Sequence, residues 1–201
     1  PSAEVGDGLV SLYQQLTSED VRYVGKIEVA EAAKVIENVQ RDINIALVNE
    51  LARIFPELEV DVEDVLSAAA TKWNFHRYTP GIGVGGHCIP VDPYYMIQRA
   101  ADVGVPAELI TAARAVNRTM PIHVAGVINE ILYKAGVPSG EGKALLLGWS
   151  YKPEVGDPRE TPAGPLAEAL QGKGISVSVW DPHLSSDELP DTVEVLNELQ
   201  D

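Results

Sequence analysis

The chain has 201 residues, 45% of them hydrophobic, which suffices for one medium domain or two small ones with a buried core. Its net charge of -15 makes nucleic acid and anionic membranes poor partners, because both repel an acidic surface. No apolar run reaches the length of a membrane span, no signal peptide is visible, and a single cysteine excludes an internal disulfide, so we expect a protein of the reducing cytoplasm.

The first third of the chain predicts a lead-in followed by one long helix. Residues 1–25 form a mixed lead-in, with a short helix at 9–16 and a short strand at 21–24. Residues 28–55 then lack glycine and proline, and Pro56 ends the segment. Apolar residues recur at helical spacing along it, namely Val35, Ile36, Val39, Ile43, Leu47, Leu51 and Ile54.

The middle third predicts further helices around a glycine-rich loop. Asp61 is placed to cap a helix that runs to about Thr71. After the loop, residues 94–103 predict another helix. Residues 107–135 predict one helix or two, with Pro121 as the candidate break.

Near residue 140 the pattern changes to that of a β-α-β unit. Residues 143–149 predict a buried strand, 162–171 a helix and 175–180 a second strand. Such a unit begins a parallel nucleotide-binding sheet, in which ligands gather at the carboxyl ends of the strands. The tail, residues 185–201, is acidic, and we expect a solvated surface there.

The only cysteine, Cys88, lies in a glycine-rich run, directly after His87 and four residues before Asp92. A nucleophilic thiol needs open access and a lowered pKa, and glycines let a backbone loop approach a ligand closely. The run therefore predicts a site of covalent catalysis. A small, buried, apolar cysteine is the alternative interpretation.

Two other interpretations of this loop are weaker. Its glycines match the dinucleotide pattern G-x-G-x-x-G, but that pattern requires a strand before it and a helix directly after it. Residues 72–80 contain no clean apolar run, and Pro90 and Pro93 delay any helix. A His-Cys metal pair lacks partners at ligand spacing, so we predict no metal site.

Lys34 and Asn38 lie four residues apart on the predicted long helix, and Asp42 continues the same stripe. On this pattern alone, a solvated helix face is the simpler interpretation.

Three segments carry a resemblance to a known family. Residues 80–95, Pro-Gly-Ile-Gly-Val-Gly-Gly-His-Cys-Ile-Pro-Val-Asp-Pro-Tyr-Tyr, are similar to the active-site segment of the UDP-sugar 6-dehydrogenases, the UDP-glucose and UDP-N-acetylmannosamine dehydrogenase family. Residues 30–38 resemble that family's substrate helix. Residues 147–162 resemble the turn after the first strand of its UDP domain, with Thr161 in place of the usual serine.

Two positions resemble the N-acetylhexosamine branch of the family in particular. His87 precedes the cysteine where the UDP-glucose branch usually has serine. Val91 stands where that branch usually has lysine.

The resemblance implies the family's architecture, α then α/β. Residues 26–136 would form an all-helical central dimerisation domain with the cysteine loop, and residues 140–201 a truncated Rossmann-like UDP-binding domain. Residues 1–25 would be a lead-in from the family's amino-terminal NAD-binding domain, which we expect to precede residue 1. We expect the carboxy-terminal domain to stop early, after its second strand.

The resemblance also implies a reaction. The C6 alcohol of a UDP-N-acetylhexosamine, by this resemblance UDP-N-acetyl-D-mannosamine, would be oxidised twice to the uronate for polysaccharide synthesis, with two NAD+ consumed. Cys88 would carry the thiohemiacetal and the thioester. Asp92 would handle water and protons, with a helix-capping role as its alternative. Lys34 and Asn38 would face C6 and stabilise a developing oxyanion.

Further residues would hold the substrate and the cofactor by the same resemblance. The substrate-binding residues would be Tyr78, Gly81, Gly85, Gly86, His87 and Lys152. Of these, Lys152 would hold the uridine nucleotide, and His87 would tune the thiol or touch the N-acetyl group, or simply pack. Arg159 would lie at the cofactor or interdomain edge, where NAD binds.

The implied partners are a UDP-sugar and a second copy of the chain, bound through the helix over residues 28–55. We expect these 201 residues to be inactive alone. UDP-N-acetylglucosamine, UDP-N-acetylgalactosamine and UDP-glucose remain alternative substrates. A non-catalytic dimerisation and UDP-binding module is the alternative from another class.

Overall fold

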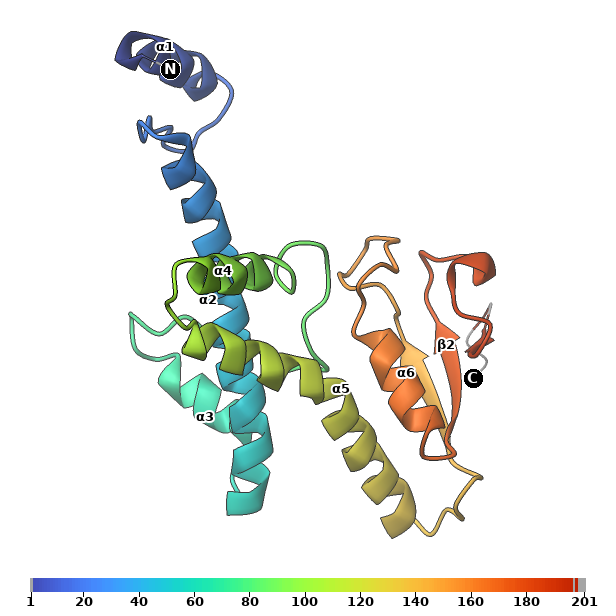
Figure 1. The fold of residues 1–201 in the computed structure, drawn as a ribbon. Coiled ribbons are helices and arrows are strands. Elements are labelled where there is room, and N and C mark those ends of the chain that lie inside the picture. Colours follow the sequence, from blue (N-terminus) through green and yellow to red (C-terminus); the bar gives the residue numbers. More distant parts are fainter. Residues whose placement is uncertain (1, 197, 199–201) are drawn as a thin grey trace.

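The computed structural model of the chain describes residues 2–196 and residue 198. Helices make up the first two thirds of the chain, and a small parallel sheet with one covering helix follows (Figure 1). The predicted fold class, α then α/β, is confirmed. In the described ranges, none of the helices has the length and apolar character that crossing a bilayer requires.

The lead-in forms a helix, α1 (Ala3–Gln14), that stands away from the rest of the molecule (Figure 1). It begins earlier than predicted because the side chain of Ser2 accepts a hydrogen bond from the Val5 amide and caps it. The predicted strand at 21–24 is wrong. That segment has no partner strand, and the Tyr23 ring packs on Gly6 of α1 instead.

The predicted long helix is confirmed as α2 (Ile27–Ile54), which at 1.5 Å per residue is about 42 Å long. It continues into the 3-10 turn η1 (Phe55–Leu58), which holds Pro56. Helix α3 (Val62–Ala69) begins at the predicted cap, since the Asp61 side chain accepts a hydrogen bond from the Glu63 amide at 2.6 Å.

Helices α4 (Asp92–Asp102) and α5 (Glu108–Lys134) complete the helical part, and both pack against α2. The candidate break at Pro121 does not occur: α5 is continuous, although Figure 1 shows a bend midway along it. Proline removes one amide from the helix ladder, which leaves the carbonyl four residues earlier, on Asn117, without its usual donor. Gly83 of the loop before α4 lies against this carbonyl, where a Cβ would be only 3.2 Å from the oxygen.

The α/β part is a parallel sheet in the order β1-β2-β3, with α6 (Ala163–Gln171) connecting the first two strands. Strand β1 (Lys143–Leu147) pairs in register with β2 (Ser176–Trp180), which confirms the β-α-β unit. The prediction of only two strands is wrong, because a short β3 (Glu194–Val195) pairs with β2 after the 3-10 turn η2 (Ser186–Glu188). Two residues are too short to show a strand period in the sequence.

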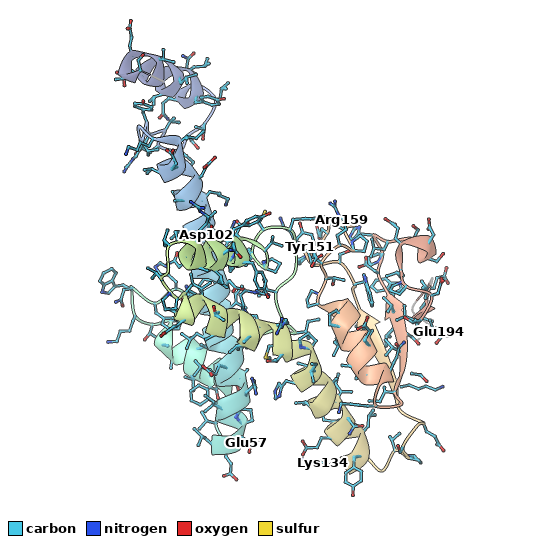
Figure 2. The ribbon with its side chains drawn as sticks, viewed as in Figure 1. Glu57, Asp102, Lys134, Tyr151, Arg159 and Glu194 are labelled. Carbon is cyan, nitrogen blue, oxygen red and sulfur yellow. The ribbon has the colours of Figure 1, made fainter. Side chains whose placement is uncertain are left out.

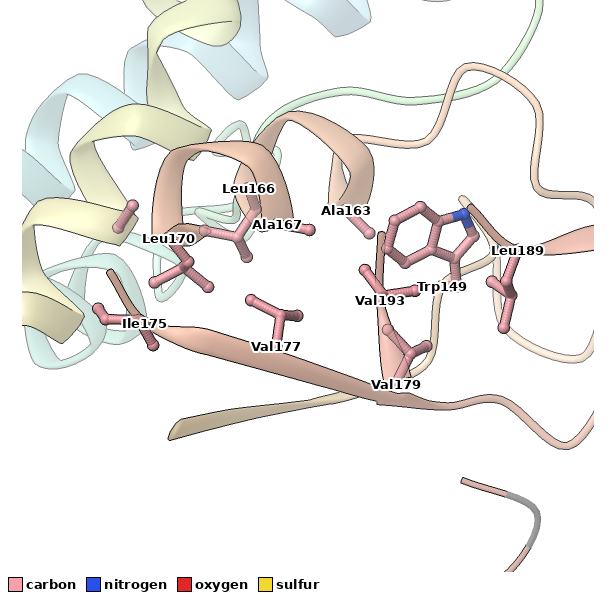
Figure 3. Close-up of a cluster of buried hydrophobic side chains, with 11 residues drawn as sticks. Trp149, Ala163, Leu166, Ala167, Leu170, Ile175, Val177, Val179, Leu189 and Val193 are labelled. Carbon is pink, nitrogen blue, oxygen red and sulfur yellow. The ribbon is translucent and has the colours of Figure 1, made fainter. Parts of the chain in front are cut away.

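The apolar core lies between this sheet and α6 (Figure 3). Alternate residues of β2 face it, and α6 contributes residues at helical spacing, while α5 closes one side. The buried cluster consists of Ala125, Trp149, Ala163, Leu166, Ala167, Leu170, Ile175, Val177, Val179, Leu189 and Val193. Strand β1 is less buried than predicted: Leu145 and Leu147 are exposed on its other face.

Candidate active site

The segment between α3 and α4 is irregular and carries the cysteine. We call residues 79–91 the cysteine loop. No strand precedes its glycines, and a helix begins only at Asp92. The loop therefore does not have the strand-turn-helix structure of a dinucleotide-binding motif. The Cys88 thiol is exposed, so the alternative of a small buried cysteine is wrong. The Cys88 carbonyl accepts the amides of Val91 and Asp92, so the thiol lies at the turn that starts α4.

Two of the predicted catalytic residues are joined directly. The Asn38 amide on α2 donates a hydrogen bond to Asp92 Oδ2 on α4 at 2.6 Å. Asn38 is buried at 4% exposure, so a solvated helix face does not describe it. Lys34 lies one turn earlier on α2 and is exposed, with its amine 3.0 Å from Glu37 Oε2. Lys34 is therefore on the same side of α2 as Asn38, but its side chain points to a neighbour on its own helix.

A network of buried polar side chains lies beneath this pair, between α2 and α5. It comprises Asp42 (0% exposed), Asn49 (0%), Arg114 (7%) and Asn117 (1%), and we call it the polar network. Arg114 Nη1 donates to Asp42 Oδ1, and Asn117 Nδ2 donates to the same oxygen at 2.8 Å. Burial raises the pKa of the Asp42 carboxyl, whereas Arg114 and Asn117 oppose that shift.

The polar network reaches the cysteine loop at two places. Asn49 Nδ2 donates to Asn117 Oδ1 at 2.9 Å, and Asn49 Oδ1 accepts the Gly81 amide at 2.8 Å. At the other end of the loop, the Arg114 guanidinium lies over the ring of Tyr94, in the first turn of α4, 5.7 Å from its centre.

Sequence reasoning missed Asn49, Arg114 and Asn117 as site residues. The one sequence signal that could have found them is the presence of polar residues inside otherwise apolar helix faces. Asn49 falls seven residues after Asp42, and Asn117 falls three residues after Arg114.

The glycines of the loop pack against the α/β part. A Cβ on Gly85 would lie 2.8 Å from Glu160 O, from Pro162 Cδ and from Tyr151 Cβ, and Gly86 has a φ of 93° and faces the Tyr151 ring. The Gly86 amide donates to Glu160 O at 3.1 Å. These glycines were predicted to wall the substrate, and here they form a tight joint between the two parts of the molecule.

The charged residues at this joint lie on the turn after β1, and Figure 2 shows Tyr151 and Arg159 at the end of the α/β part beside the loop. His87 Nε2 is 3.9 Å from Asp157 Oδ2, and its ring meets that of Tyr151 edge-on at 6.0 Å. Arg159 donates to both carboxylate oxygens of Asp157, at 2.9 Å each. These hydrogen bonds hold the pKa of Asp157 at about 2.

The remaining predicted binding residues are Lys152 in the α/β part and Tyr78 and Gly81 in the helical part. Lys152 is exposed on the turn after β1, at the carboxyl edge of the sheet. Tyr78 is half-buried directly before the cysteine loop, and Gly81 is exposed, with nothing within 4 Å of the place where a Cβ would be. The Asp181 carboxylate after β2 accepts the amides of Trp149 and Ser150, which fixes how this turn leaves β1.

A cavity of about 270 Å³ lies under the cysteine loop. Loop residues cover it, α5 and Tyr94 form its helical wall, and the turn before α6 closes it. Its polar lining includes Arg114, Asn117, Arg118, Glu160 and Thr161. In the part of the chain that the structure describes, no group of three or more His, Cys, Asp or Glu residues is arranged to hold a metal ion.

Comparison with protein families gives two matches that divide the chain as the fold does. The central-domain model of the UDP-glucose/GDP-mannose dehydrogenase family matches residues 28–119. The UDP-binding-domain model of the same family matches residues 145–201.

Relatives match nearly the whole chain but are much longer. The UDP-N-acetyl-D-glucosamine 6-dehydrogenase of Pseudomonas aeruginosa is 41% identical over 92% of this chain and 44% of its own length. The structure of the Pyrococcus horikoshii UDP-ManNAc dehydrogenase superposes with a TM-score of 0.75 at 34% identity, over 88% of this chain and 42% of that one. A UDP-glucose dehydrogenase from Pyrobaculum islandicum gives a TM-score of 0.85 at 26% identity, over 98% and 45%. The chain thus spans less than half the length of these relatives.

Proposed function

The chain belongs to the UDP-glucose/GDP-mannose dehydrogenase family, and on that premise we propose that it supplies the thiol half of an NAD-dependent UDP-N-acetylhexosamine 6-dehydrogenase. The observation that carries the proposal is the exposed Cys88 thiol at the start of α4, four residues before an Asp92 carboxylate bonded to Asn38. A nucleophile next to an oriented carboxylate suits covalent catalysis followed by hydrolysis.

The proposed chemistry converts a primary alcohol to a carboxylate in two oxidations. NAD+ supplies the hydride acceptor for both. The C6 alcohol first loses a hydride and a proton and becomes an aldehyde. The Cys88 thiolate adds to the aldehyde carbon, a second hydride leaves the resulting thiohemiacetal, and a thioester remains. Water then attacks the thioester carbon, the C–S bond breaks, and the uronate and the Cys88 thiol are released.

The residues around Cys88 have separate roles in this scheme. Asp92, oriented by the Asn38 amide, accepts the proton of the attacking water. The Lys34 amine, which is exposed and paired with Glu37 on its own helix, turns to the substrate oxygen and stabilises its negative charge.

The polar groups at the joint suit the two nucleotides. Lys152 lies at the carboxyl edge of the sheet, where a nucleotide phosphate is expected, and Gly85 and Gly86 contact the same turn after β1. Arg159 is exposed beside Asp157, on the side of His87 and the thiol, and a guanidinium there fits the pyrophosphate of NAD+. The turn after β1 lacks the dinucleotide glycine pattern, so we assign only Arg159 to the cofactor.

The substrate proposal rests on the N-acetylhexosamine branch. His87 and Val91 flank the nucleophile as in that branch, and relatives named for UDP-N-acetylglucosamine and UDP-N-acetylmannosamine match at 41% and 38% identity. UDP-N-acetyl-D-mannosamine is the substrate we favour, with UDP-N-acetylglucosamine, UDP-N-acetylgalactosamine and UDP-glucose as the alternatives.

We also propose that α2 pairs with a second copy of the chain. Ile36, Leu47 and Ile54 are exposed along one helix, and an apolar groove of about 340 Å³ lies between α2 and α5. Exposed apolar side chains beside an apolar groove favour association with another protein surface. Sedimentation of the chain and of a Leu47→Glu variant tests this, and a monomeric parent chain contradicts it.

Calorimetric binding of UDP-N-acetyl-D-mannosamine to the chain tests the nucleotide-sugar half of the site. We expect Lys152→Ala to lose binding. Lys173→Ala, which removes a lysine beyond the far end of α6, should not. Equal binding by both variants contradicts the role of Lys152.

The reaction is tested by measuring turnover with the protein purified from the cells that naturally produce it. Cys88→Ala should abolish formation of the uronate, and comparison of the four UDP-sugars identifies the substrate. Binding without turnover in the parent protein would instead indicate a non-catalytic UDP-binding module.

A further inference from the structure

The cysteine loop is held at its two ends and spans a cavity between them. Near its start, the Gly81 amide is bonded to Asn49. At its end, Asp92 is bonded to Asn38, and the following turn contacts Arg114 through Tyr94. The cavity of about 270 Å³ lies beneath Gly83, Val84, Pro90 and Val91. Between its ends, the loop touches α5 only around Gly83, which lies beside the Asn117 carbonyl, and it meets the α/β part at Gly85 and Gly86.

The residues that hold both ends come from one face of α2. Asn38, Asp42 and Asn49 are spaced by four and then seven residues, which places them on one side of a helix. All three are almost fully buried, and a single helix therefore fixes the distance between the two ends of the loop.

The contacts at the two ends are connected through α5. Asn117 bonds both Asn49 and Asp42, and Arg114 bonds Asp42 and contacts Tyr94. A side chain at one end of the loop is thus linked to the other end by an unbroken series of polar contacts. Removing one partner leaves a buried polar group without its hydrogen bond, which costs free energy. The contacts of the series should therefore form or break together.

We propose that Asn49, together with Asp42, Arg114 and Asn117, positions the Cys88 nucleophile by setting the separation of the two ends of the cysteine loop. These are positioning residues, because none of them contacts the thiol or an assigned substrate group. The proposal rests on the proposed function only for its effect on catalysis. The predicted effect on the conformation of the cysteine loop does not depend on any enzymatic activity.

The single cysteine allows a direct test on the chain as it stands. Cys88 is labelled with a trifluoroacetone group, and the fluorine NMR spectrum reports the environment of that one residue. We compare the parent with Asn49→Ala and with Asn44→Ala, a matched control on the same helix whose side-chain amide donates to the Gln40 carbonyl. In Asn49→Ala we expect a second resonance whose share rises about five-fold, the change in population that one net hydrogen bond supplies. Asn44→Ala should match the parent.

A purely structural role gives a different result. If Asn49→Ala lowers the melting temperature but leaves the fluorine spectrum unchanged, the proposal is overturned. If Asn49→Ala does not fold, Asn49→Ser replaces it. Its hydroxyl is too short to reach Gly81 but leaves room for a water, and it should give the same second resonance. A parent-like spectrum for Asn49→Ser overturns the proposal equally.

Steady-state kinetics on the protein purified from the cells that naturally produce it distinguish this proposal from the proposed function. Asn49→Ala should lower kcat at least ten-fold while KM for the nucleotide sugar changes less than about two-fold, because a misplaced reacting group costs rate rather than ground-state binding. An unchanged kcat overturns the positioning role. If Cys88→Ala remains active, the proposed function fails, and the fluorine result still decides whether the polar network holds the loop.

Discussion

The two parts of the molecule have opposite interiors. Between α6 and the sheet, the buried side chains are aliphatic or aromatic, as in Val179 and Leu170. Between α2 and α5, the most buried side chains include Asp42, Asn49 and Asn117. An apolar interior stabilises a fold without specifying fine geometry, whereas buried polar groups are costly when left unbonded and therefore favour the arrangement that bonds them. The polar interior lies under the cysteine loop, where positions matter most.

The largest effect should come from breaking the buried ion pair. Arg114→Met leaves the Asp42 carboxylate buried without its cation, which should cost about 3–5 kcal/mol of unfolding free energy. Urea unfolding followed by circular dichroism measures it. The double variant Asp42→Leu/Arg114→Met should recover most of this loss, since an apolar pair of similar volume removes the unpaired charge. No recovery would mean that the polar interior also carries stability that apolar packing cannot replace.

Truncation in the apolar interior should cost slightly less. Leu170→Ala removes a fully buried side chain and should lower the free energy of unfolding by about 2–5 kcal/mol. Trp149 lies in the same cluster, so its fluorescence reports the transition. Leu109→Ala, at a leucine that is 66% exposed, is the matched control, and an equal loss in both would contradict the assignment of the core.

A larger side chain at the joint between the two parts should lower the stability of the fold. Gly85→Ala places a methyl group 2.8 Å from three atoms of the turn after β1, and such overpacking should cost about 1–3 kcal/mol. Gly81→Ala adds the same group in open space and should cost much less. Thermal unfolding of the two variants compares them, and the reverse order of stability would show that the joint is looser than the structure indicates.

The smallest effect on stability should appear when the pH is lowered. Arg159 holds the pKa of Asp157 at about 2, below the ordinary 3.8, so the stabilisation from this pair is present above 3.8 and is lost as the pH falls through about 2. Carbon NMR titration of the Asp157 carboxyl measures the midpoint. Arg159→Gln should move it back toward 3.8, and a parent midpoint already at 3.8 would rule out a persistent pair in solution.

Local pattern was enough to predict most elements of the fold. The uninterrupted apolar period gave α2, Asp61 marked the start of α3, and the change of period near residue 140 located the β-α-β unit. The errors arose where tertiary contacts decide. Pro121 stays within a continuous α5, where Gly83 packs beside the freed carbonyl, and β3 is too short to show a period.

The site was predictable only in part for the same reason. Cys88 and Asp92 stand in one recognisable run, and their exposure and placement suit the proposed roles. The polar network joins residues 68 to 75 positions apart in the sequence, and one sequence does not reveal which polar residues on two separate helices meet.

The joint at Gly85 and Gly86 has a mechanical consequence. Because the loop backbone contacts Tyr151 and Glu160 without room for even a methyl group, and the Gly86 amide is bonded across the gap, the α/β part cannot rotate against the helices without pulling on this loop. Cys88 lies two residues further along. Any change in the angle between the two parts is therefore transmitted to the backbone beside the thiol.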